Sequence, residues 1–222
     1  MSDFILRDMT PANLSNYVAR QLSTYFPDGR VISAETIHAF MSDALERTRL
    51  CFTGIEKKKF RDGVQVMFNY LHPDHYAMFL YLLSNTVSRL DKQNPLAFRL
   101  FYLNKALHGL DAYHDTELPE VFQFMHPLGT ILGQATYGNY FCVYQGCSVG
   151  CDEQGIFPVI GEHVVLYAGA SVIGRSHIGN NVVISANTMV LNQDICNNKL
   201  VFTQPQLEIR DNKRHVIERR FK

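Results

Sequence analysis

The stretch Ile160–Ile195 reads IGEHVV, LYAGAS, VIGRSH, IGNNVV, ISANTM, VLNQDI when it is divided every six residues. A period of six fits neither a helix, with 3.6 residues per turn, nor a strand, with two. It is typical of a parallel β-helix, in which each hexad forms one short face and its turn. We therefore expect the aliphatic residue that opens each hexad to point into a narrow prism: Ile160, Leu166, Val172, Ile178, Ile184 and Val190. We expect the small or β-branched fifth residues to let the corners close: Val164, Ala170, Ser176, Val182 and Thr188, with Asp194 as the exception.

Less regular hexads precede this run. They open at Leu132, Tyr137, Val143 and Val149, so one step is five residues and the step to Ile160 is eleven. We expect a local irregularity at the first step. At the second, residues 151–158 (CDEQGIFP) should leave the prism as a loop, and binding groups tend to lie on such loops.

The N-terminal half has helical periodicity instead. Helices are predicted over residues 10–26, 33–49, 73–90 and 95–108, with N-caps at Thr10 and Ser33 and a C-terminal glycine at position 109. The third is apolar nearly all round, which predicts a buried helix or a subunit interface. Residues 51–63, with three consecutive lysines, are interpreted as an exposed connection.

The predicted fold is α+β: a helical domain at 1–109, a β-helix at 110–205 and a C-terminal tail at 206–222. The basic tail at 213–222 is interpreted as a solvated helix or strand cap.

Composition narrows the class of protein. The chain has 222 residues and a formal net charge of zero, which does not favour nucleic acid or an anionic membrane as a partner. No run approaches the ~20 apolar residues that span a bilayer. The start, MSDFILRDMT, lacks the apolar core of a signal peptide, and five cysteines form no framework spacing. We expect a cytoplasmic protein with reduced thiols.

One pair of residues carries a family resemblance. Asp111 precedes His126 by fifteen residues, and HPLGTILG then ends at Gly133. Residues 139–150, NYFCVYQGCSVG, likewise end in a glycine just before the expected loop. In these features the chain resembles the serine O-acetyltransferases among the hexapeptide-repeat acyltransferases. The resemblance implies a left-handed β-helix, with His126 as general base and Asp111 as its orienting partner.

The chemistry of that pair is sound. A neutral imidazole can take the proton of a hydroxyl or ammonium group that attacks a thioester, and a carboxylate at the other ring nitrogen stabilises the imidazolium that forms. Such a base contributes ~10²–10⁴-fold in rate. The structural alternative is that His126 only fills a corner of a coil and Asp111 only ends a helix.

The resemblance also implies acetyl-CoA as co-substrate, bound in the groove between β-helices of a homotrimer. Small residues let a pantetheine arm approach the backbone. The matching positions are Gly150, Ala168, Gly169 and Ala186, although small residues are also needed simply to close corners. A homotrimer is expected, with a dimer of trimers through residues 73–108 as a further assembly.

Departures from the family bear on the acceptor. An Arg-His-Pro run that holds the amino acid in serine O-acetyltransferases is matched here by Ile156-Phe157-Pro158. Without that arginine, a carboxylate loses its bidentate partner. We therefore expect a small-molecule acceptor that is a sugar hydroxyl or a nucleotide-linked amino sugar, as in surface-polysaccharide synthesis, with Phe157 and His114 beside it. Serine O-acetylation is the alternative, and a non-catalytic assembly protein is the alternative of another class.

A metal site is not expected. His126, His163 and His177 invite comparison with trimeric β-helix carbonic anhydrases, but the last two occupy the fourth and sixth positions of their hexads. Cys142, Cys147 and Cys151 lack a CxxC pair, and Cys147 should be buried. Tyr137, Tyr140 and Tyr144 are interpreted as cover on the outside of the coil at a trimer contact, with stacking on a sugar or base as the alternative.

Overall fold

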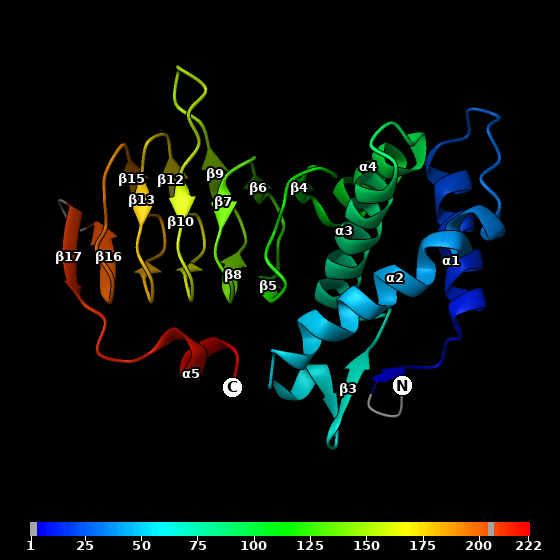
Figure 1. Cartoon of the computed structure of the whole chain (residues 1–222), viewed down its shortest axis with the longest axis horizontal. Helices are drawn as coiled ribbons and strands as arrows, with labels where there is room; N and C mark the ends of the chain where they lie inside the picture. The colour runs from blue at the N-terminus through cyan, green and yellow to red at the C-terminus, as the bar shows by residue number, and fades with distance from the viewer. Residues whose placement is uncertain (1–3, 204–206) are drawn as a thin grey trace.

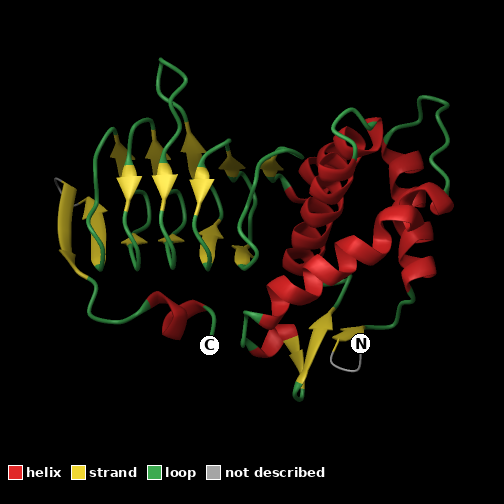
Figure 2. Cartoon of the chain, in the orientation of Figure 1, coloured by secondary structure: helices red, strands yellow, loops and turns green. Residues whose placement is uncertain are grey.

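The computed structural model describes residues 4–203 and 207–222, and it contains a helical N-terminal half followed by a stack of short parallel strands (Figure 1). Figure 2 separates the two halves by their secondary structure. The N-terminal elements are β1 (Phe4–Leu6), α1 (Pro11–Tyr25), α2 (Ala34–Thr53), the 3₁₀ turn η1 (Lys58–Phe60), β2 (Arg61–Asp62), β3 (Gln65–Phe68), α3 (Pro73–Leu90) and α4 (Pro95–His108).

The four predicted helices are confirmed, and three of their ends have the expected caps. Thr10 and Ser33 accept hydrogen bonds from the backbone of the first turns of α1 and α2, at 3.2 and 3.1 Å. Gly109 ends α4 with a φ of 62°, a left-handed conformation that glycine adopts without a steric cost. Helix α3 is buried on nearly every side, as its apolar sequence predicts.

The interpretation of residues 51–63 as an exposed connection is wrong. Helix α2 continues to Thr53, and Cys51, Phe52, Ile55 and Phe60 are fully buried in the core of the helical half. The Phe52 and Phe60 rings meet edge to face at 4.7 Å. These apolar side chains supply enough buried surface to fold the segment back onto α3, so the lysines between them are held in place.

The second half is the predicted parallel β-helix. Its strands are β4 (Asp111–Ala112), β5 (Phe122–Met125), β6 (Ile131–Leu132), β7 (Thr136–Tyr137), β8 (Phe141–Tyr144), β9 (Ser148–Gly150), β10 (Val159–Ile160), β11 (Val165–Leu166), β12 (Ser171–Ile173), β13 (His177–Ile178), β14 (Val183–Ile184), β15 (Met189–Leu191) and β16 (Lys199–Thr203). They form three faces, ordered β16-β14-β11-β8-β5, β15-β12-β9-β6-β4 and β13-β10-β7. Each residue pairs in parallel with the residue one coil away, so the hexads lie in register.

The hexad pattern correctly identifies the interior. All six opening aliphatics and all five regular fifth residues are at most 3 % exposed. Asp194 instead forms an ion pair with His177 at 2.9 Å on the surface. Cys147 is fully buried, as predicted.

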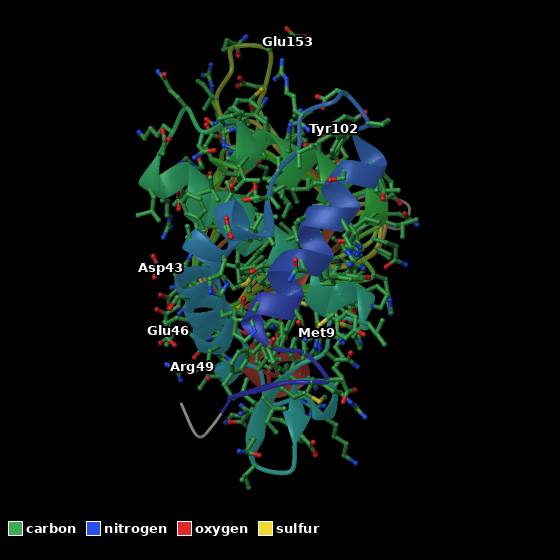
Figure 3. All side chains as sticks on the ribbon, turned by 90° about the vertical axis from the view of Figure 1, so that its right-hand side faces the viewer. Met9, Asp43, Glu46, Arg49, Tyr102 and Glu153 are labelled. Carbon is green, nitrogen blue, oxygen red and sulfur yellow. The ribbon has the colours of Figure 1, made fainter. Side chains whose placement is uncertain are left out.

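Residues 151–158 leave the prism as a loop between β9 and β10, as predicted, and Glu153 marks its position in Figure 3. Inside the loop the Asp152 carboxylate accepts hydrogen bonds from the backbone of Gln154 and Ile156 at 2.9 and 3.0 Å. It also accepts one from Arg175 at 3.3 Å. These bonds attach the loop to the next coil.

The C-terminal residues return along the outside of the prism. Strand β17 (Leu207–Asp211) pairs antiparallel with β16, and α5 (Val216–Arg220) lies beneath the strands in Figure 1. Val216 and Phe221 are fully buried, so the interpretation of the tail as merely solvated is wrong. The Val216 backbone N–H donates to the Asn181 side chain at 2.9 Å. The expected boundary at 205/206 lies outside the described residues.

Across the described ranges, no helix combines the length and the apolar character that crossing a bilayer requires.

Candidate functional site

Four turns lie one above another where the face β5-β8-β11-β14 meets the face β6-β9-β12-β15. We call residues 126–130, 145–147, 167–170 and 185–188 the corner column. Backbone hydrogen bonds join consecutive turns: Gly146 N–H donates to Leu128 O at 2.8 Å, Gly169 N–H to Gln145 O at 2.9 Å, and Asn187 N–H to Ala168 O at 2.9 Å. The column therefore connects the turn of His126 with three further turns.

His126 occupies the first position of this column, directly after β5. Its φ of 52° is left-handed, and its side chain is 72 % exposed, so the imidazole projects from the corner instead of filling it. The backbone N–H of His126 donates to the Asp74 carboxylate at 3.1 Å, and the ring Nδ1 lies 3.9 Å from the same oxygen. The buried carboxylate thus holds the backbone of the turn, and the exposed imidazole is available to a ligand.

Asp74 lies in the first turn of α3, and its side chain is only 3 % exposed. Its other oxygen accepts a hydrogen bond from Lys59 Nζ at 2.8 Å. Lys59 thus supplies a counter-charge to the buried carboxylate beside His126. The interpretation of the lysine run as solvated surface is therefore wrong for Lys59. From the sequence, Asp74 is an ordinary acidic residue at a helix start, and only the fold places it at this corner.

A hollow of about 370 Å³ opens beside His126. Its lining combines side chains from the helical half, from β5 and from the C-terminal helix: Lys57, Lys59, His72, Asp74, Gln123, Met125, His126 and Arg220. Burial, and then the charge of Lys59, lowers the pKa of His72, so its ring is neutral near pH 7. We call this space the His126 hollow.

Asp111 lies on the segment that adjoins the first turn of the column. Its backbone N–H donates to Thr130 O, and Gly129 N–H donates to Gly109 O, both at 2.9 Å. The Asp111 carboxylate, however, accepts a hydrogen bond from Lys105 Nζ at 2.6 Å. Among the residues that the structure describes, no hydrogen bond or ion pair joins Asp111 to His126. The two segments are thus brought together, while each side chain has a different charged neighbour.

Three of the four candidate cofactor residues belong to the corner column. Ala168 and Gly169 lie two coils from the His126 turn, and Ala186 lies three coils away, roughly 14 Å at 4.7–4.9 Å per coil. Their turns carry no large side chain other than Tyr167. Gly150 ends β9 at the opposite edge of the same face, where its carbonyl accepts from Gly174 N–H at 2.9 Å. Gly150 is therefore separated from Ala168, Gly169 and Ala186 by the width of this face.

The two candidate acceptor residues lie elsewhere in the protomer. A Cβ on Gly133 would come within 2.7 Å of the Phe157 ring, so this ring packs on the backbone at the other edge of the β6 face. His114 is 4 % exposed; its Nδ1 lies 3.0 Å from Ser88 Oγ of α3, and its ring contacts Phe98 of α4. Neither residue lines the His126 hollow.

The two other histidines that were considered as metal ligands, His163 and His177, have separate partners. His163 stacks on Tyr140 at 4.8 Å, and His177 pairs with Asp194, so neither joins His126 within the protomer. No group of three or more potential metal ligands occurs in residues 4–203 and 207–222.

The three tyrosines expected on the outside of the coil differ in place: Tyr137 is buried, Tyr140 stacks on His163, and Tyr144 stacks on Tyr167.

Comparison with known proteins identifies relatives of the β-helix half. Residues 157–192 match the bacterial transferase hexapeptide family, described as six repeats. Serine acetyltransferase of Synechococcus elongatus is 29 % identical over 136 residues, which is 59 % of this chain and 54 % of that protein. The chain spans about half the length of the curated relatives it matches. The resemblance to serine acetyltransferases with hexapeptide repeats is thus confirmed.

Solved structures show the same fold. Serine acetyltransferase of Neisseria gonorrhoeae in complex with serine has a TM-score of 0.68 at 22 % identity, covering 90 % of this chain and 84 % of that one. A serine acetyltransferase in complex with CoA also has a TM-score of 0.68, at 17 % identity, covering 89 % and 84 %. At these identities the likeness establishes the architecture, helical half included.

Proposed function

We propose that this protein is an acetyl-CoA-dependent acetyltransferase that acts on a hydroxyl or amine of a small molecule, with His126 as the general base. The observation that carries the proposal is the corner column, which begins at an exposed imidazole and leads to the small residues Ala168, Gly169 and Ala186. The match to the hexapeptide family and the names of the relatives support it.

In the proposed reaction, the acceptor lies in the His126 hollow and its hydroxyl donates to the imidazole. His126 takes the proton while the acceptor oxygen or nitrogen attacks the thioester carbonyl. The CoA thiolate leaves and receives the proton back from the imidazolium. Asp74, 3.9 Å from Nδ1, lowers the energy of the imidazolium as it forms. The family resemblance assigns the same role, stabilising the imidazolium, to Asp111. For this, the Asp111 carboxylate must leave Lys105 and hydrogen-bond to the imidazole.

Acetyl-CoA is proposed to lie along the corner column, with its thioester at His126 and its pantetheine arm beside Ala168, Gly169 and Ala186. One of the related structures contains CoA, which supports acetyl-CoA as the co-substrate. Small side chains permit contact between the arm and the backbone. Gly150 lies at the opposite edge of this face. It would contact the same ligand only by lining the other side of the groove between two subunits.

A homotrimer is proposed because one prism face presents apolar residues to solvent. On the face β15-β12-β9-β6, the exposed fractions are 51 % for Ile131, 59 % for Met189 and 49 % for Leu191. Met189 and Leu191 lie together on β15, whereas Ile131 lies three coils away on β6. Large exposed apolar side chains on one face favour a subunit interface. In such an assembly the loop at 151–158, with Phe157, approaches the site of a neighbour. Tyr102 of α4 is 57 % exposed; labelled in Figure 3, it offers a contact for a dimer of trimers.

Serine is the first acceptor to test, because the curated relatives are named serine acetyltransferase. A sugar hydroxyl or amine is the second candidate, because Ile156-Phe157-Pro158 lacks the arginine of the serine enzymes. The experiment is mass spectrometry of products from acetyl-CoA with serine and with a panel of amino sugars and sugar phosphates. An O- or N-acetylated product supports the proposal, and acetyl-CoA left intact with every acceptor contradicts it.

A further inference from the structure

The C-terminal helix contributes a cation to the His126 hollow. The Arg220 guanidinium lies over the rings of Tyr144 and Tyr167, 5.3 and 4.8 Å from their centroids, and it donates to the Tyr167 hydroxyl. Its Nε is buried without a hydrogen-bond partner. Within the described ranges no carboxylate forms an ion pair with Arg220. An arginine has five N–H donors, so most of those of Arg220 have no hydrogen-bond partner among the residues that the structure describes.

The position of Arg220 is fixed by its neighbours. Phe221 is fully buried and contacts Tyr140, and its carbonyl accepts the Glu56 backbone N–H. Lys57 Nζ donates to the Arg219 carbonyl at 3.1 Å. These contacts attach the end of the chain to the helical half. The guanidinium is therefore preorganised at the hollow, and a ligand would not have to order it.

The charge of the hollow is unbalanced. Lys57, Lys59 and Arg220 bring three cationic groups, and Asp74 is the one carboxylate in the lining. Asp74 is already paired with Lys59. The charges of Lys57 and Arg220 thus remain uncompensated within a partly enclosed space, where electrostatic attraction is stronger than in bulk water.

We propose that Arg220 binds an anionic group of the acceptor, a carboxylate or a phosphate, and so determines which acceptors reach His126. This proposal rests on the proposed function, which identifies the bound molecule as an acetyl acceptor. A guanidinium recognises either group in a bidentate manner. Arg220 would thereby supply, from the same chain, the cation that is missing at Ile156-Phe157-Pro158.

The test is isothermal titration of two matched ligand pairs into the full-length protein at constant ionic strength: L-serine against L-serinamide, and glucosamine 6-phosphate against glucosamine. We expect the anionic member of at least one pair to bind at least tenfold more tightly. In Arg220→Gln this ratio should fall below threefold, whereas Arg220→Lys should retain part of it. Arg214→Gln, an exposed site on the same tail, should leave it unchanged.

The outcomes separate the sources of the anion. A preference confined to the serine pair identifies a carboxylate, and one confined to the glucosamine pair identifies a phosphate. Equal binding of both members, no binding of either, or a preference that survives Arg220→Gln overturns the proposal. It is also overturned if Arg220→Gln weakens CoA binding while the pair ratios stay fixed, because the cation would then hold a CoA phosphate. Binding does not require turnover, so the proposal can fail while acetyl transfer is observed, and the reverse.

Discussion

The Asp74 carboxylate accepts a hydrogen bond from the backbone N–H of His126 at 3.1 Å and lies 3.9 Å from the Nδ1 atom of the same residue. One carboxylate thus contacts the turn that gives His126 its left-handed conformation and faces the ring that the turn presents. Helix α3 and strand β5, far apart in the sequence, meet through this contact. The helical half is therefore part of the site.

Two asparagine substitutions distinguish the carboxylates near His126. Asp74→Asn keeps an acceptor for the backbone of His126 but removes the charge that favours imidazolium, so we expect kcat to fall roughly 10–100-fold. Asp111→Asn should cause the larger loss if Asp111 leaves Lys105 during the reaction. The measurement is kcat of both variants over pH 6–9 at saturating acetyl-CoA. If each retains wild-type kcat, neither carboxylate assists the base.

Asp74→Asn should also destabilise the fold. The substitution leaves Lys59, which is 25 % exposed, without its counter-charge at a site where Asp74 itself is buried. We expect the free energy of unfolding to fall by roughly 1–3 kcal/mol, because Lys59 can still reach water. Urea denaturation measures the change, and Asp115→Asn on the exposed surface is the control. A midpoint unchanged from wild type would show that the ion pair contributes nothing.

Enlarging the corner column should weaken binding of acetyl-CoA. In Ala186→Leu, the new side chain projects from an exposed turn where the pantetheine arm is proposed to lie, so we expect KM for acetyl-CoA to rise at least tenfold with little change in stability. Glu162→Leu, at a different corner, is the matched control. Initial rates over a range of acetyl-CoA concentrations test this. Equal KM values for the two variants would remove the column as the cofactor path.

Charge on the apolar prism face should prevent assembly. In Leu191→Glu and Met189→Glu, a carboxylate would be buried without a partner between subunits, which costs more than association can supply. We expect the mass from light scattering to fall from three times 25.4 kDa to 25.4 kDa. Val64→Glu, on an exposed turn of the helical half, should remain trimeric. A wild-type protein that is already monomeric would contradict the proposed assembly.

Acid should destabilise the helical half through buried histidines. Burial lowers the pKa of His75 to about 2 and that of His108 to about 4, whereas both rings have a pKa near 6.5 when unfolded. Below pH 6.5 the two histidines bind protons in the unfolded chain but not in the folded one. The stability that they contribute is therefore complete above pH 6.5 and is lost as the pH falls.

The expected slope is roughly 1.4 kcal/mol per pH unit for each histidine between pH 6 and 4.5. In His75→Phe the stacking position between Phe60 and His72 is kept while the proton site is removed. This variant should therefore lose about half of the contribution that His75 and His108 make together. Urea midpoints at several pH values measure the difference between the two proteins. Parallel pH curves would show that His75 is not held neutral.

The prism interior follows from the sequence because a period of six assigns each residue a fixed place in a coil. Ile160 and Leu166 were therefore predictable individually. The outer surface was not: Cys142 and Val165 alternate with the inward-pointing Val143 and Leu166, yet they are buried as well. Their burial depends on long-range packing, which no local pattern encodes.

The candidate site was only partly predictable for the same reason. His126 was identified through its spacing from Asp111 and the glycine that follows. Asp74, Lys59 and Arg220 come from a helix start, a lysine run and a basic tail, and each of these has an ordinary surface interpretation in isolation. Their meeting depends on how the helical half packs on the first coil, through aromatic contacts such as that of Tyr81 with Phe122.

The central claim is that the imidazole of His126 removes a proton during acetyl transfer. The most direct measurement is the rate of CoA release from acetyl-CoA, with the best acceptor, in His126→Ala and in His177→Ala, which removes an exposed imidazole on another face. We predict a loss of ~10²–10⁴-fold for His126→Ala and a change below twofold for His177→Ala. A His126→Ala protein that transfers acetyl groups at the wild-type rate would contradict the account.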